Sequence, residues 1–278
     1  MMSNVKKLFI FLFSLVFGVI FAMAVSLAVA YFSDHAVAAS APPESSSVEA
    51  DGVEHIQLTV ELGKVRVVPG DAKEITIEYQ YPPEGFLDNQ LRIVSDRDGS
   101  DLSIRISSKQ KMYFFGLIKD KACDITVSIP RDLLPAVSIK MQAGTLTIDN
   151  PELKSLDIDG DIAEISIVKL GTAALEEVTV NNNIGNITAY LDNFSGQTVK
   201  DFTASVNIGT VELHLRLDEK RGYRLDYAYN IGSFERKEER SFGVGKSASY
   251  ETEEEQSALY QIKTDIGGIR VYEDRGAA

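Results

Sequence analysis

Tryptophan is absent from this sequence of 278 residues, which contains one cysteine and three histidines. Cys123 cannot form an internal disulfide, and the alternating residues after it predict a packed thiol beside a strand. His35, His55 and His214 are far apart and lack zinc-ligand spacing, so we expect surface positions for them. Nucleophile elbows, phosphate-binding loops and dinucleotide fingerprints are missing as well. The sequence therefore predicts no catalytic residue, no metal and no cofactor.

Positive charge is also scarce. The chain has 28 basic and 41 acidic residues, a formal net charge of −13. Because binding of nucleic acids requires a basic surface, this balance argues against DNA or RNA as a partner.

Charge is missing altogether from residues 8–33, which follow Lys6 and Lys7. This run exceeds the ~20 apolar residues that cross a bilayer, so residues 1–33 are predicted to be a single membrane anchor. The two lysines should remain in the cytoplasm, which places the rest of the chain outside the cell membrane. The alternative is a signal peptide cleaved near Ala38, releasing a secreted protein.

Residues 34–50 are rich in Ala, Ser and Pro and are predicted to form a flexible linker. Beyond them no segment has a helical apolar period. Residues 51–276 instead repeat a strand pattern in which apolar residues alternate on both sides of a small corner residue. The corners are Gly63, Gly144, Ala163, Gly185, Gly209, Gly232 and Gly267.

Apolar residues recur seven, five and one positions before each corner and two positions after it, and all four columns are predicted to lie in the core. The column one position before consists of Leu62, Ala143, Ile162, Ile184, Ile208, Ile231 and Ile266. Two positions before the corner, Asn side chains recur and could hydrogen-bond from one coil to the next. The predicted corner residues include Asn183, Gly185, Asn207, Gly209, Asn230, Gly232, Asp265 and Gly267.

This pattern predicts an all-β fold, specifically a single-stranded β-solenoid similar to a parallel β-helix, with coils stacked ~4.8 Å apart. The step to the last corner contains an acidic insert within residues 237–257. The insert is interpreted as a solvated hairpin, with a docking loop as the alternative.

Residues 109–121 are the one basic and aromatic segment of an acidic chain. They could contact anionic lipid or a protein partner, and the plain alternative is a pair of strands or a packed cap with outward lysines. The candidate contact residues are Lys111, Tyr113, Phe114, Phe115 and Lys119.

Asp157, Asp159 and Asp161 are the best candidates for a cation site. Alternate residues of a strand are ~6.6 Å apart, so one ion cannot contact all three without a bend. A solvated acidic stripe is the favoured interpretation.

The strand Ile125–Pro130, the segments 137–140 and 144–148, and the closing Thr264–Ile269 resemble the bacterial putative-adhesin β-solenoid family of unknown function, which includes LiaG-like membrane proteins. The resemblance covers about residues 51–273. It implies a right-handed β-solenoid, often anchored to the membrane and sometimes encoded with envelope-stress systems.

The sequence thus predicts a non-enzymatic binding or scaffold module at the bacterial cell envelope. Its partners would be the membrane, through the N-terminal helix, and an envelope protein or glycan. The alternative is a carbohydrate-active enzyme, a polysaccharide lyase or a glycosidase, on a β-helix scaffold. A lyase needs clustered basic residues for acidic sugars, and the outward positions carry few. A glycosidase needs two carboxylates, which so acidic a surface does not exclude.

Overall fold

The computed structural model describes residues 44–80, 90–109, 123–149, 152–169, 175, 177–193, 199–217, 221–237, 239–252 and 255–275. Every regular element in these ranges is a β-strand, which confirms the all-β prediction. None of the described segments is a helix long and apolar enough to cross a bilayer. The predicted anchor, residues 1–33, lies outside the described ranges, as do residues 34–43 of the predicted linker.

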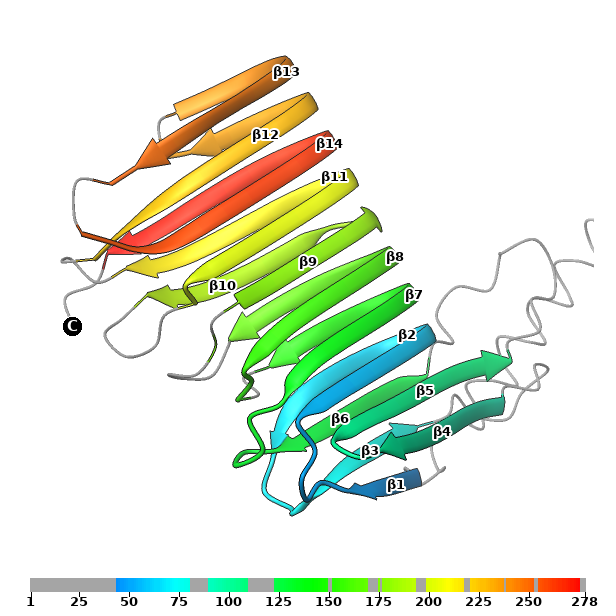
Figure 1. Cartoon of the computed structure of the whole chain (residues 1–278). Coiled ribbons are helices and arrows are strands. Elements are labelled where there is room, and N and C mark those ends of the chain that lie inside the picture. Colours follow the sequence, from blue (N-terminus) through cyan, green and yellow to red (C-terminus); the bar gives the residue numbers. More distant parts are fainter. Residues whose placement is uncertain are drawn as a thin grey trace, which may run out of the picture.

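Fourteen strands form one sheet (Figure 1). They are β1 (Glu44–Glu49), β2 (His55–Gly70), β3 (Glu74–Gln80), β4 (Gln90–Asp98), β5 (Asp101–Lys109), β6 (Asp124–Pro130), β7 (Ala136–Asp149), β8 (Ser155–Lys169), β9 (Glu177–Ile184), β10 (Ile187–Asn193), β11 (Asp201–Leu217), β12 (Arg221–Arg236), β13 (Glu239–Glu251) and β14 (Glu255–Arg275).

The long strands stack in parallel with equivalent residues in register, as the repeat predicts. Gly63 of β2 pairs with Gly144 of β7, which pairs with Ala163 of β8. Farther along, Gly209 of β11 pairs with Gly267 of β14.

Each long strand bends at its corner, so that its two halves lie in two layers (Figure 1). Buried apolar side chains of both halves form the core. In β12, Tyr227 precedes the corner and Phe234 follows it, and their rings stack with centroids 3.7 Å apart. The inward positions are seven, five and three residues before the corner and two and four residues after it. On β11 these are Phe202, Ala204, Val206, Val211 and Leu213, all buried.

The order of the stack departs from the order of the chain. The last coil, β14, lies between β11 and β12 and is parallel to both. The insert expected within residues 237–257 contains β13, which pairs antiparallel with β12 and forms one end of the stack.

At the other end, the two layers separate beyond β2. The half of β2 before the corner pairs with β5, which pairs with β4. The half after the corner pairs with β6, followed by β3 and β1. The linker prediction is therefore wrong for residues 44–49, which form β1, because Val48 packs against the core while the serines extend the sheet.

Candidate functional site

The corner glycines are required by both conformation and space. Gly185, Gly209 and Gly267 have φ values of 127°, 151° and 153°, which side chains other than glycine rarely adopt. A Cβ atom on Gly209 would lie 1.7 Å from the carbonyl oxygen of Gly185 in the neighbouring coil. Gly232 lacks a positive φ, yet a Cβ atom there would lie 1.8 Å from the carbonyl oxygen of Gly267. At Gly185, Gly209, Gly232 and Gly267 the backbone of the adjacent coil therefore approaches too closely for a side chain, whereas the corner of β8 carries the small side chain of Ala163.

The polar residues before these glycines form side-chain hydrogen bonds between coils. Asn207 Nδ2 donates to Asn183 Oδ1 at 2.9 Å, and Asn230 Nδ2 donates to Asp265 Oδ1 at 2.9 Å. The buried amide of Asn182, one position earlier, donates to the carbonyl oxygen of Ala163. These bonds rigidify the corner edge.

The prediction that the column one position before the corner lies in the core is wrong. Ile162, Ile184, Ile208, Ile231 and Ile266 are 40–58% exposed, although they stack in register from strand to strand. The bend begins two residues before the glycine, so this position faces solvent, and the inward position is two residues earlier. The corner thus presents a column of exposed apolar side chains.

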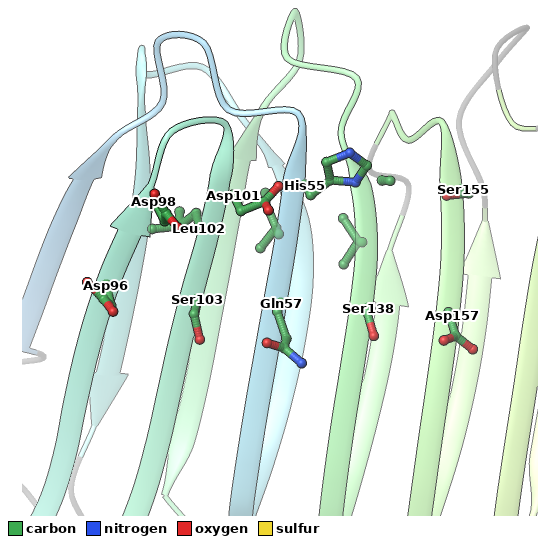
Figure 2. A pocket seen from close by; sticks show the side chains of 13 residues that line it. His55, Gln57, Asp96, Asp98, Asp101, Leu102, Ser103, Ser138, Ser155 and Asp157 are labelled. Atoms are coloured by element: carbon green, nitrogen blue, oxygen red, sulfur yellow. The ribbon is translucent and has the colours of Figure 1, made fainter.

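A groove of about 510 Å³ lies on the outer face of the layer before the corner (Figure 2). Five strands contribute to it, in the order β4, β5, β2, β7 and β8. One row of directly paired residues crosses all five: Asp96, Ser103, Gln57, Ser138 and Asp157. Strand spacing places these side chains ~4.8 Å apart. His55, Asp98, Asp101 and Ser155 line the rim.

The groove is acidic and contains no lysine or arginine among its lining residues. Burial raises the pKa of Asp157, and the neighbouring carboxylate of Asp159 raises it further. A surface of this kind repels anions and offers hydroxyl, amide and carboxylate groups for hydrogen bonds.

The aspartates proposed for a cation do not form a closed site. Asp157, Asp159 and Asp161 lie on β8, and throughout the described ranges no three His, Cys, Asp or Glu side chains are grouped closely enough to hold a metal ion.

Residues 53–214 match the family model described as Toastrack DUF4097. The chain belongs to the Toastrack DUF4097 family. The match ends within β11, and the chain continues beyond the matched residues through β12, β13 and β14. This confirms the resemblance to a putative-adhesin family of unknown function.

A crystal structure of a putative cell adhesion protein from Clostridium sporogenes shares this fold. The alignment covers 84% of this chain and 99% of the Clostridium chain, with 15% sequence identity and a TM-score of 0.52. A putative adhesin from Bacteroides fragilis aligns over 84% of this chain and 98% of its own at 9% identity, and its TM-score of 0.29 is too low to support an argument. Among curated proteins, none matches this sequence.

The outer face of the second layer carries a column of rings in the Toastrack chain. His214 lies between Tyr190 and Tyr272, with ring centroids 4.3 and 4.6 Å apart and nearly parallel planes. His214 was expected at the surface, and the two rings leave it half-buried. This burial lowers the pKa of its imidazole. Tyr190 and Tyr272, on either side of His214, are both 45% exposed.

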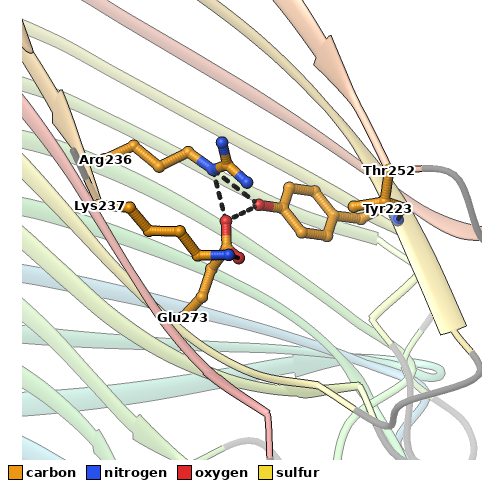
Figure 3. Close-up of polar contacts among 5 residues, drawn as sticks. All are labelled: Tyr223, Arg236, Lys237, Thr252 and Glu273. Atoms are coloured by element: carbon orange, nitrogen blue, oxygen red, sulfur yellow. Dashed lines mark hydrogen bonds and ion pairs between the residues drawn. The ribbon is translucent and has the colours of Figure 1, made fainter. Parts of the chain in front are cut away.

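A buried ionic cluster joins β12 and β14 near the β13 end of the Toastrack stack (Figure 3). The Glu273 side chain is fully buried and accepts hydrogen bonds from Tyr223 and Arg236, while Lys237 Nζ lies 2.7 Å from Glu273 Oε2. Burial alone would raise the pKa of Glu273, but the hydrogen bonds from Lys237, Tyr223 and Arg236 lower it overall. Tyr223, Arg236 and Glu273 are enclosed and paired with one another, and the half-exposed Lys237 covers Glu273 from the solvent side, which indicates a structural role.

The predicted basic and aromatic contact lies outside the described residues. Lys109 ends β5, and residues 110–122, with Lys111, Tyr113, Phe114, Phe115 and Lys119, follow it. Cys123 is buried, and burial raises the pKa of its thiol to about 11, so it is a poor nucleophile near neutral pH.

Proposed function

We propose that this chain is a non-enzymatic binding module at the bacterial cell envelope, built as a short β-solenoid on an N-terminal membrane anchor. The observation that supports it is the row of five outward polar side chains in the groove, supplied by strands from three separate parts of the sequence: β2, the β4–β5 hairpin, and β7 with β8. A rigid stack holds such a row in fixed positions before a ligand arrives, which lowers the entropic cost of binding.

The groove favours a neutral or amino-sugar glycan as the ligand. Hydroxyl groups of a sugar both donate and accept hydrogen bonds, which matches Ser103, Gln57 and Ser138. The carboxylates of Asp96 and Asp157 accept hydrogen bonds and attract ammonium groups, and they disfavour acidic glycans. The Clostridium protein of the same fold is a putative cell adhesion protein, and adhesion is consistent with this type of partner.

The test is calorimetric titration of the full chain with chitosan oligosaccharides, their N-acetylated forms and oligogalacturonate. We expect binding of the first two only. Ser138→Ala should weaken binding about fivefold, near 1 kcal/mol for one hydrogen bond. Ser166→Ala, on the outer side of β8 after its corner, is the matched control and should bind as the wild type does. Equal affinity for oligogalacturonate, or no difference between the two variants, contradicts the groove as the site.

The carbohydrate-active enzyme remains the alternative, and the same samples test it. Chromatography of the oligosaccharides after prolonged incubation should show unchanged chain lengths. Shortened products that disappear in Asp157→Asn would replace the binding proposal with a hydrolytic one.

The membrane location rests on the uncharged run of residues 8–33 after Lys6 and Lys7. The resemblance to LiaG-like proteins extends the proposal to a role beside envelope-stress signalling. Fractionation of cells should find the chain in the membrane, with residues 51–276 digested by protease added outside intact protoplasts. Recovery from the culture medium with an N-terminus near Ala39 would support the cleaved, secreted form instead.

A further inference from the structure

The strand β13 ends the stack and is paired on one side only. All of its 13 residues except Gly245 are paired with residues of β12, and within the described part of the chain no strand lies along its other edge (Figure 1). Ten of them are exposed, and Phe242 and Val244 reach 85% and 79% exposure. A long edge strand without proline is a template for pairing with another strand.

The charges of β13 differ from those of the whole chain. Glu239 and Glu251 are balanced by Arg240 and Lys246 in a protein of net charge −13. Two copies of this protein repel each other over most of their surfaces, but two β13 strands meet without net repulsion.

We propose that β13 pairs antiparallel with β13 of a second copy, about a twofold axis at Gly243 and Val244. The bend of the strand selects this occupant. Gly243 pairs with Gly232, the corner of β12, so β13 follows both layers of the stack. A straight peptide could pair with only one layer, whereas a second β13 bends at the same place. The twofold axis pairs the half of β13 before its bend with the half after the bend in the second copy, so each layer of one copy continues into the other layer of its partner.

The side chains on the inner side of β13 are complementary in this arrangement. Lys246 pairs with buried Tyr229, and Glu239 pairs with buried Arg236, so both point toward the end of the core. The axis places Lys246 opposite Ser241 of the second copy and diagonal to its Glu239, within reach of a long side chain. Among the described residues of its own chain, Lys246 forms no ion pair.

The outer side of β13 also fits a second copy. Phe242 comes opposite Gly245 of the second copy, and an aromatic ring covering a cross-strand glycine stabilises sheet edges. The exposed corner column of Ile162, Ile184, Ile208, Ile266 and Ile231 runs on to Val244, which pairs with Ile231. The axis brings the Val244 side chains of the two copies together and joins their corner columns.

The test is sedimentation equilibrium of the full chain in a mild detergent. We expect a monomer–dimer equilibrium that Lys246→Glu weakens at least about tenfold, because acidic groups then face each other across the axis. The charge reversal Glu239→Lys with Lys246→Glu should restore dimerisation to within about threefold of the wild type. Lys73→Glu makes the same change in net charge at the opposite end of the stack and should have little effect.

Thermal unfolding of each variant confirms that the fold is retained, since Lys246 and Glu239 are both exposed. A wild type that stays monomeric at high concentration overturns the proposal and leaves the edge to a different partner. Equal weakening by Lys246→Glu and Lys73→Glu, or a charge reversal that restores nothing, overturns it as well.

Discussion

Glycine at the corner is the residue on which the stack depends most directly. Gly209 combines a φ value of 151° with a neighbouring carbonyl oxygen 1.7 Å from its notional Cβ atom. Because the obstacle is backbone, it cannot rotate away as a side chain would. Gly243 on β13 has no atom within 4 Å of the corresponding point.

We therefore predict that Gly209→Ala lowers the free energy of unfolding by about 2 kcal/mol or more, from strain at φ and displacement of the neighbouring coil. Gly243→Ala should change it by less than about 0.5 kcal/mol. Urea denaturation of both variants measures the difference. Similar values for the two glycines would contradict the close approach of the coils.

Glu273 gives a second prediction at the same scale. Its pKa in the folded protein lies below the ordinary value of 4.5, because hydrogen bonds from Lys237, Tyr223 and Arg236 outweigh burial. The ionised cluster therefore contributes stability above the ordinary pKa, and this contribution is lost as the pH falls through the lowered one.

Glu273→Gln should thus reduce the unfolding temperature most at about pH 7, and the gap to the wild type should narrow toward about pH 3. Calorimetric scans at several pH values measure this gap. Glu54→Gln, at an exposed position, should unfold close to the wild type throughout. A gap for Glu273→Gln that is constant with pH would mean that the buried carboxylate is not ionised.

At the scale of the strand, most of the fold could be predicted from the sequence. Alternation predicts the buried columns five positions before and two after each corner, and recurring glycine predicts the bend between them. The error at Ile266 arises because four consecutive residues face outward around the bend, and one of them is apolar. β-branched residues suit extended backbone and pack against the same residue in the next strand, so isoleucine recurs there without burial.

Two isoleucines of β14 test this reading of the corner. Ile269 is fully buried and Ile266 is half-exposed. Ile269→Ala should lower the free energy of unfolding by about 2–5 kcal/mol, whereas Ile266→Ala should cost at most about 1 kcal/mol. Urea denaturation of the two variants compares the same substitution three residues apart. Equal losses would place Ile266 in the core after all.

At the scale of the whole molecule, the repeat does not determine which coil neighbours which. Placing β12 or β14 beside β11 brings glycine onto glycine and isoleucine onto isoleucine in either order. In this chain, the hairpin of β12 and β13 lies one strand farther along the stack, and β14 then fills the position between β11 and β12. The groove could not be predicted from the sequence either, since it depends on the β4–β5 hairpin, which lies outside the repeat.

Each coil contacts only its neighbours, so stability should rise from the ends of the stack toward its middle. We predict that, in dilute solution, backbone amides exchange slowest in β8, the middle strand of the stack, and fastest in the end strands β4 and β13, measured by hydrogen exchange and mass spectrometry. Raising the protein concentration should slow exchange in β13 and leave β4 unchanged, because the proposed axis pairs only β13. An equal slowing in both strands would indicate unspecific association, and a β13 already as protected as β8 in dilute solution would show that it is not a free edge.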